Sequence, residues 1–260
     1  MPKYTVIQLK NFKGGLHLAR GLTNSYDKSL DTLHSDTLKS AIFVSALNLY
    51  GGEKISEQFF KQFKISSAFP FFFSRSEGRP IYFFPRPETV KLPIQIEGGN
   101  DGQEKNLKKI RYIETELFKQ ILSGVKDIKL TDENIAGSYV SGSALKLRSL
   151  LEKENCEAII RSEPYQHVHL PRDFGQDSEP YFVDKLYFHE QAGLFFLLDT
   201  EGLPEVEHQV LSAMKLLADS GIGTDRNTGN GHFEIEIDEI ELDVPNTESY
   251  QMTLSLYWPT

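Results

Sequence analysis

The sequence has a single cysteine and no long hydrophobic run. Cys156 has no second cysteine with which to form an internal disulfide or a cysteine-based zinc site, which is typical of a reducing compartment. The longest apolar runs, such as Phe69–Phe73 and Leu194–Leu198, are far shorter than the roughly 20 residues that a membrane span requires. No charged-then-apolar signal segment opens the chain. We therefore expect a cytoplasmic protein that has no membrane partner.

Positive charge is also scarce. The chain has 28 Lys and Arg residues against 37 Asp and Glu residues, which gives a formal net charge of -9 at pH 7. This balance argues against a free-standing nucleic-acid binder, because such proteins usually carry an excess of Lys and Arg for the phosphates. The charges are segregated, however, since residues 3–39 carry six bases and three acids, whereas residues 234–243 carry six acids and no base. The sequence therefore predicts two electrostatically different surfaces.

The chain does contain enough apolar residues to build a globular core. These residues recur in periodic patterns that indicate both strands and helices. The predicted strands are 5–10, 81–84, 193–198, 233–242 and 252–256, and the predicted helices are 35–50 and 204–220. A slip of the apolar phase at Asp238–Glu239 predicts a bulge or bend in its strand. The order of the elements predicts an α+β fold made of two tandem modules of the split βαβ (ferredoxin-like) type, residues 1–153 and 154–260.

The strongest local signal is the glycine-rich segment Gly221–Phe233, which lies between a predicted helix and a predicted strand. Its four glycines permit positive φ values and a close approach of another backbone, so that successive amides can face an anion, and Arg226 supplies a positive charge. A helix-to-strand turn that binds no ligand would use the same residues. The segment is not a nucleotide-binding P-loop, because the Gly-Lys-Ser/Thr ending is absent and a strand follows where a helix would be needed.

Two further segments have residues suited to an anion. Residues 11–21 follow the first predicted strand and combine glycines, bases and an aromatic side chain, which are the groups that a phosphate backbone needs, although a solvated turn is the alternative. His34–Asp36 lies at the start of a predicted helix, where free backbone amides favour an anion. Ser35 and Asp36 are equally suited to capping the helix.

Catalytic groups do not form a recognisable motif. His17, His34 and Lys39 have the side chains of a metal-independent ribonuclease, but nothing in their spacing requires that role. His167 and His169 alternate as strand neighbours and lack a third ligand at a recognisable spacing, so we interpret them as surface histidines. We predict no catalytic site, no metal and no cofactor.

Taken in order, six segments resemble a known family, the fourth Csm subunit of type III-A CRISPR effector complexes in the Repeat-Associated Mysterious Protein superfamily. The resemblance covers nearly the whole chain, and the ordered set is more specific than the glycine-rich segment alone. The segments are Phe12–His17, Leu33–Ala41, Lys108–Ile113, Pro180–Val183, Ala192–Leu197 and Gly221–Phe233.

The resemblance implies a non-catalytic, RNA-binding subunit with two RNA-recognition-type modules and no small-molecule substrate. Its implied partners are the repeat-derived 5′ handle of the guide RNA (crRNA), the large polymerase-like subunit and the backbone subunit of the Csm filament. A β-hairpin thumb is expected at Ile159–Phe188. Family members usually continue past the strand that ends here at 257–260, so the chain is expected to be either a short member of the family or a truncated product.

The resemblance also implies which residues hold the RNA, chiefly by gripping phosphates and sugars. They are Lys13, Gly14, Gly15, His17 and Arg20; His34, Ser35 and Lys39; His167, His169 and Arg172; and Gly221, Gly223, Thr224, Arg226, Asn227, Gly229 and Gly231.

Two other functions stay open from the residues alone. A repeat-processing ribonuclease of the same superfamily would share the fold and the glycine-rich segment but would need a general base, such as His17 or His34. An enzyme that binds a nucleotide would use the glycine-rich segment for phosphate, and its nucleotide would raise the melting temperature.

Overall fold

The computed structural model of the protein describes residues 3–19, 28–87, 92–97, 107–169, 178–242 and 252–256. Arg20, Arg172 and the chain end at 257–260, which figure among the sequence predictions, lie outside these residues.

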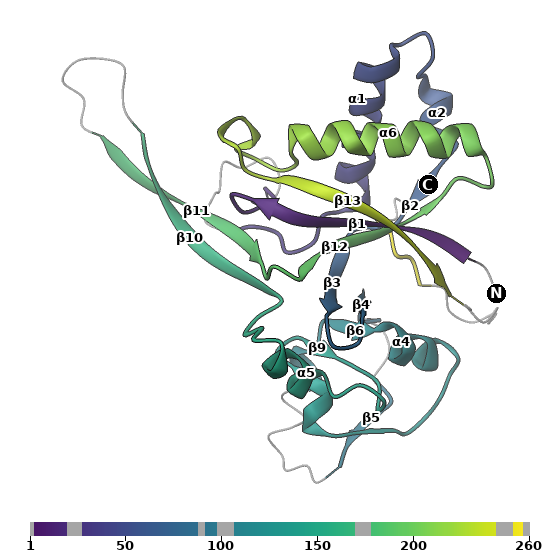
Figure 1. The fold of residues 1–260 in the computed structure, drawn as a ribbon, viewed down its shortest axis with the longest axis vertical. Coiled ribbons are helices and arrows are strands. Elements are labelled where there is room, and N and C mark those ends of the chain that lie inside the picture. Colours follow the sequence, from purple (N-terminus) through teal and green to yellow (C-terminus); the bar gives the residue numbers. More distant parts are fainter. Residues whose placement is uncertain are drawn as a thin grey trace.

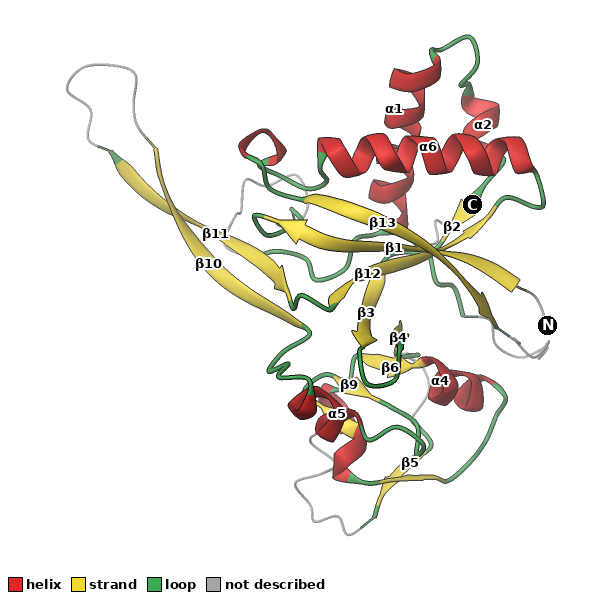
Figure 2. Ribbon diagram, in the orientation of Figure 1, coloured by secondary structure: helices red, strands yellow, loops and turns green. Residues whose placement is uncertain are grey.

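Nine strands of the described residues form one mixed sheet that runs through the whole body of the molecule (Figures 1 and 2). Neighbouring strands are antiparallel except for one parallel pair, β6 with β9. In spatial order the strands are β13 (His232–Glu241), β1 (Lys3–Lys13), β12 (Ala192–Asp199), β3 (Phe69–Ser74), β4 (Arg79–Pro85), β6 (Tyr112–Glu114), β9 (Tyr139–Val140) and β8 (Ile135–Ala136), and β2 (Lys64–Ile65) pairs with β12.

Two smaller pairs of strands complete the β-structure. β10 (Ile160–His169) and β11 (Glu179–Phe188) form a long antiparallel hairpin that projects away from the body in Figure 1. β5 (Ile94–Ile96) and β7 (Ile128–Leu130) form a short parallel pair in the lobe that holds β6, β8 and β9. The hairpin strands are thus where the sequence places the thumb.

Helices cover the sheet on both faces. The helices are α1 (Ser35–Tyr50), α2 (Glu57–Lys61), α4 (Thr115–Leu122), α5 (Leu147–Lys153) and α6 (Pro204–Ser220), with short 3-10 turns η1 (Asp132–Asn134) and η2 (Arg226–Thr228). α1 and α6 pack on the face of β1 and β12 that carries Ile7, Leu9 and Phe196. α4 packs on the opposite face, where Val6 and Phe195 are buried. α5 closes a third apolar cluster with β4 and β9.

Because β1 and β12 are central and covered on both faces, alternate residues of each strand enter different cores. The predicted α+β class is confirmed by this mixture of sheet and helices. The predicted helices 35–50 and 204–220 are also confirmed, since Pro204 begins α6 and Gly221 follows its last residue. β12 and β13 share the sheet with β1 and β3, and the division of the chain at residue 153 stays a prediction.

Two features predicted near the C-terminus, a bulge in β13 and a strand at 252–256, are not present. β13 pairs with β1 without a break from Glu241 to Glu234, and the irregularity of this pairing lies between Lys10 and Lys13 of β1, so the slip at Asp238–Glu239 is not a bulge. Residues 252–256 are not a strand, because their backbone forms isolated hydrogen bonds instead of a ladder with a neighbouring strand. Ser67 N donates to Leu254 O (2.8 Å), and Leu256 N donates to Ser35 Oγ (3.0 Å). Met252 and Leu254 pack against the core.

The prediction of two separate charged surfaces is wrong along β1. Antiparallel pairing places β13 beside β1, so Lys3 Nζ lies 3.6 Å from a carboxylate oxygen of Glu239, and Lys10 pairs with Glu236. Lys3 and Lys10 of β1 are therefore neutralised by the acids of β13. Within the described ranges, no helix is both long and apolar enough to cross a membrane.

Candidate nucleic-acid interface

The structure brings together the two glycine-containing segments that the sequence singles out. Gly231 N lies 3.0 Å from both Lys13 O and Gly15 O, and Thr224 N donates to His17 O (3.0 Å). Lys13–His17 and Gly221–Gly231 thus form one unit, which we call the glycine junction.

Close backbone approach explains why the buried part of the glycine junction needs glycine. At Gly231, where φ is +70°, a Cβ atom would stand 2.0 Å from the carbonyl oxygen of Ile222. At Gly223, where φ is +89°, it would stand 2.5 Å from the carbonyl oxygen of His17. Neither position can accept a side chain without moving backbone. The amides of Gly231 and Thr224 are therefore used to join the two segments to each other.

The outer part of the glycine junction is exposed and positively charged. η2 carries Arg226 and Asn227 into solvent, and Lys13, Gly14 and Gly229 are also exposed. Lys13 and Arg226 form no ion pair with any residue that the structure describes. Asn230 fixes this tip from below, since its Nδ2 donates to Thr228 Oγ1 (2.8 Å) and to Asp225 O (3.3 Å).

A third element, the base of the β10–β11 hairpin, completes the glycine junction. Leu16 and Leu186 exchange two backbone hydrogen bonds of 2.9 Å and 2.8 Å. His17 Nδ1 lies 2.6 Å from the carbonyl oxygen of Asp184, which can only accept, so Nδ1 carries the proton. Lys185 Nζ donates to Asn230 Oδ1 (3.1 Å). Sequence reasoning missed Asp184, Lys185 and Asn230, because the contact of the hairpin with the loops has no local signature.

His17 was predicted to lie among the residues that hold RNA, but its side chain is buried. Its side chain is only 2% exposed and holds the hairpin base against the first glycine segment. We therefore expect His17 to shape the glycine junction rather than to touch RNA directly, and its role in binding stays a prediction.

The residues predicted around the start of α1 lie at a second location. His34 is the N-cap of α1, and its side chain makes no capping bond. Ser35 is buried, where its Oγ accepts from Leu256 N. Lys39 Nζ lies 4.5 Å and 4.9 Å from the ring centres of Phe60 and Phe63. Burial lowers the pKa of Lys39, and the charge of Lys64 lowers it further.

The outer half of the hairpin presents aromatic rings to solvent. His167 stacks on Tyr181 at 5.3 Å between ring centres and meets the edge of Tyr165 at 5.1 Å. Tyr165, Tyr181 and Phe182 are all 40% or more exposed. Exposed rings on a projecting hairpin can stack with unpaired bases. His169 is exposed at the end of β10, and Tyr165, Tyr181 and Phe182 were not among the predicted site residues.

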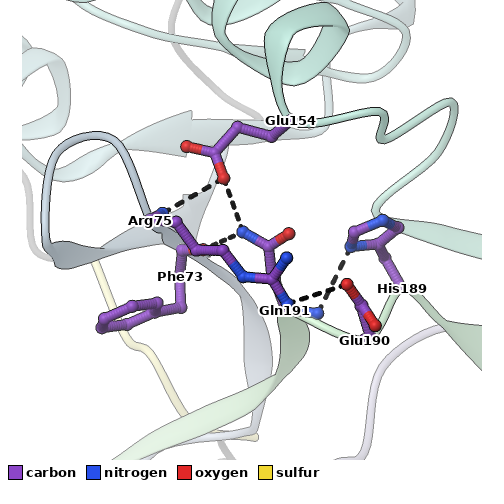
Figure 3. Close-up of polar contacts among 6 residues, drawn as sticks. All are labelled: Phe73, Arg75, Glu154, His189, Glu190 and Gln191. Atoms are coloured by element: carbon purple, nitrogen blue, oxygen red, sulfur yellow. Dashed lines mark hydrogen bonds and ion pairs between the residues drawn. The ribbon is translucent and has the colours of Figure 1, made fainter.

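The hairpin root is held at a second point by Glu154, at the end of α5 (Figure 3). Gln191, in the turn between β11 and β12, donates from Nε2 to Glu154 (2.6 Å) and to Phe73 O (2.8 Å). The same carboxylate accepts from the backbone N–H of Arg75 (3.1 Å) and from the backbone and hydroxyl of Ser76 (2.9 and 2.7 Å). Burial acts to raise the pKa of Glu154, but these hydrogen bonds outweigh it and leave the pKa below its ordinary value.

The chemistry that this arrangement supports is the holding of an anionic polymer. The glycine junction offers exposed bases and backbone, and the hairpin offers rings, which are the groups that bind phosphates and nucleobases. Within the described ranges, no three His, Cys, Asp or Glu side chains gather to hold a metal ion.

No family model matches the sequence. Two relatives, each a CRISPR system Cms protein Csm4, align over 244 residues. The relative from Thermococcus onnurineus (strain NA1) is 30% identical, and the match covers 88% of this chain and 71% of the relative. The relative from Methanocaldococcus jannaschii is 24% identical, and the match covers 84% of this chain and 63% of the relative. The chain thus spans about two thirds of the length of these relatives.

Solved structures have a similar fold. A chain of the Csm3-Csm4 subcomplex in the type III-A CRISPR-Cas interference complex matches with a TM-score of 0.60 at 20% identity, covering 92% of this chain and 70% of that chain. A chain of the Csm1-Csm4 cassette in complex with cA4 matches with a TM-score of 0.59 at 23% identity, covering 95% of this chain and 74% of that chain. At these identities the likeness establishes the fold.

Proposed function

Because this chain belongs to the Csm4 family of type III-A CRISPR complexes, we propose that it is the subunit that holds the repeat-derived 5′ handle of the guide RNA. The observation that carries the proposal is the glycine junction, where two segments predicted to bind RNA meet the base of a projecting hairpin. Lys13 and Arg226 on its exposed side would take phosphates, and the hairpin rings would stack with bases beyond it.

The acidic net charge is consistent with this role inside an assembly. An isolated chain of charge -9 lacks long-range attraction for RNA, so we expect RNA to be held only where partner subunits contribute to the channel. The similar solved chains come from a Csm3-Csm4 subcomplex and a Csm1-Csm4 cassette. We extend these partners to this chain, as the backbone subunit and the large subunit that it joins.

The finer description of the fold belongs to the same proposal. We interpret β1, α1, β12, β3, α6 and β13 as the shared centre of two ferredoxin-like modules, with β10–β11 as the thumb. The proposed subunit has no catalytic activity of its own, and its cytoplasmic location stays a prediction from the sequence.

The first test is co-purification of the tagged chain with the products of neighbouring genes, followed by sequencing of the bound RNA. Short RNAs that share a repeat-derived 5′ end are expected. A clean monomer without RNA or partners would contradict the proposal. Cleavage of a repeat RNA by the isolated chain, abolished by His17→Ala or His34→Ala, would favour the ribonuclease alternative, which no contact described above supports.

Arg226→Ala tests the exposed tip of the glycine junction. We expect retention of the guide RNA in the assembled complex to weaken by about 1 to 3 kcal/mol, because a charge-assisted hydrogen bond to phosphate is lost. Arg79→Ala is the matched control, since it removes an exposed arginine at the start of β4. If complexes with Arg226→Ala and Arg79→Ala retained the guide RNA equally well, Arg226 would not be an RNA-binding residue.

A further inference from the structure

Lys185 is a buried cation at the centre of the glycine junction. Lys185 is 4% exposed, and its Nζ donates to the amide oxygen of Asn230 at 3.1 Å. The ring of Tyr165 covers the ammonium at 4.5 Å from the ring centre. Both contacts stabilise a positive charge, but neither neutralises it.

The carboxylates next to Lys185 are bound to other groups. Glu163 lies directly opposite Lys185 in the hairpin register and on the same face, yet its Oε1 forms an ion pair with Arg161 Nε at 3.1 Å. Asp184, the preceding residue, accepts from Ser29 N (2.9 Å) and from Ser162 Oγ. Within the described ranges, no acidic side chain forms an ion pair with Lys185. A buried ammonium without a counter-charge is costly, and an anion that arrives from outside the chain would offset this cost.

Lys185 is also positioned where such an anion would arrive. Asn230 accepts from Lys185 and donates to Thr228 and Asp225, so a single side chain joins the ammonium to the exposed tip that carries Arg226. On the other side, the Cβ of Lys185 lies 3.3 Å from the place where a Cβ of Gly15 would stand. Only glycine at position 15 leaves this space beside the lysine stem.

We propose that Lys185 is a phosphate-binding residue of the glycine junction, whose ammonium takes a phosphodiester oxygen of the bound RNA when the exposed ring of Tyr165 turns aside. The inference rests on the proposed function and adds a residue that the sequence motifs did not include. In this proposal the ammonium of Lys185 binds the phosphate. The hydrogen bonds of Asn230 hold that ammonium close to the exposed tip that carries Arg226.

Two variants test the charge separately from the hydrogen bond. Lys185→Met keeps the shape of the stem and removes both the charge and the donor, whereas Lys185→Gln removes the charge and keeps a donor for Asn230. The assembled complex would be reconstituted with each variant, and its affinity for the guide RNA measured at several salt concentrations. Lys129→Gln, which removes an exposed charge on β7, is the control.

We expect both variants to bind the RNA about tenfold more weakly at a fixed salt concentration. The slope of log affinity against log salt should become shallower by about 0.7, the value for one phosphate contact on a single strand, while Lys129→Gln keeps the wild-type slope. A slope change in whichever variant folds is sufficient, and melting temperatures would show that the variant is folded.

Three results would overturn the inference. An unchanged slope with weakened binding would make Lys185 a purely structural residue, and a loss confined to Lys185→Met would assign the effect to the hydrogen bond with Asn230. Wild-type slope and affinity in both variants would leave it no role. In all three cases the wild-type complex still carries RNA with a repeat-derived end, so the proposed function stands. A wild-type complex without such RNA would remove both proposals.

Discussion

The two halves of the β10–β11 hairpin share one continuous register, yet they differ in what surrounds them. In the half near the body, Lys185 and Leu186 are buried, and the strand bonds to Leu16 and Asn230. In the outer half, Tyr165, Tyr181 and Phe182 face solvent. The difference shows that strand pairing makes the hairpin, whereas tertiary contacts at its base set its direction. The rings of the outer half are open to solvent, whereas Lys185 near the body lies beneath the ring of Tyr165.

The glycine-rich segment also has a packed position, Gly231, and an open one, Gly229. Substituting the packed glycine has the largest effect on stability that we expect. Gly231→Ala would place a Cβ 2.0 Å from Ile222 O at a positive φ, so we expect the free energy of unfolding to fall by about 3 kcal/mol or more. Gly229→Ala has a similar φ of +87° and nothing within 4 Å of the added Cβ, so the loss should be about 1 kcal/mol. Urea denaturation of the two variants measures the difference.

Equal losses in the two glycine variants would contradict the view that Gly231 is needed for close approach of the two segments. They would indicate that positive φ alone decides which positions of the loop are glycine.

Leu186→Ala and Phe182→Ala compare the two halves of the hairpin directly. Leu186 belongs to the main core and exchanges backbone bonds with Leu16, so its truncation should cost about 2 to 4 kcal/mol of the free energy of unfolding. Phe182 is exposed on the same strand, and its truncation should change that free energy by less than about 0.5 kcal/mol. Comparable denaturation midpoints for the two variants would show that the hairpin base is not part of the cooperative core.

Glu154→Gln tests the second anchor of the hairpin root and has the smallest expected effect. The amide replaces an acceptor oxygen with a donor where several donors converge, which should cost about 1 kcal/mol of stability at pH 7, since solvent reaches part of the site. The pKa of Glu154 is lowered on folding, so its contribution is present above the ordinary value of 4.5 and is lost as the pH falls below that value.

The stability difference between wild type and Glu154→Gln should therefore shrink when unfolding is measured at pH 3 instead of pH 7. A difference that stays constant over this range would mean that the carboxylate charge is not what holds the turn at Gln191.

Much of the fold was predictable because its signals are local. The apolar stripe after His34 and the Pro and Gly that bracket 204–220 indicated the two long helices. Alternation indicated β1, and continuous apolar runs indicated β4 and β12. The segment 252–256 alternates equally well, yet it is irregular, because no neighbouring strand takes up its bonds. A pattern of period two states which side chains can be buried together, but it does not supply a partner strand.

The candidate site shows the same division. Lys13, Arg226 and the glycines were visible from composition and order, since glycine and a base between two elements indicate a tight, cationic turn. Lys185 was not visible, because its neighbour Asn230 lies 45 residues away along the chain and its carboxylate neighbours bind other groups. Nothing in the strand Glu179–Phe188 distinguishes this lysine from a solvated one.

The sequence by itself determined the two long helices, the longer strands of the central sheet, the glycine turns and the family, since these depend on residue type and on spacing within short stretches. Only the tertiary structure decided that Lys3 and Lys10 of β1 are neutralised by β13, that His17 is buried, and that one lysine of the hairpin lies without a counter-charge beneath the exposed tip. The physical reason is that the energy of a charge depends on its surroundings, and distant parts of the chain supply those surroundings.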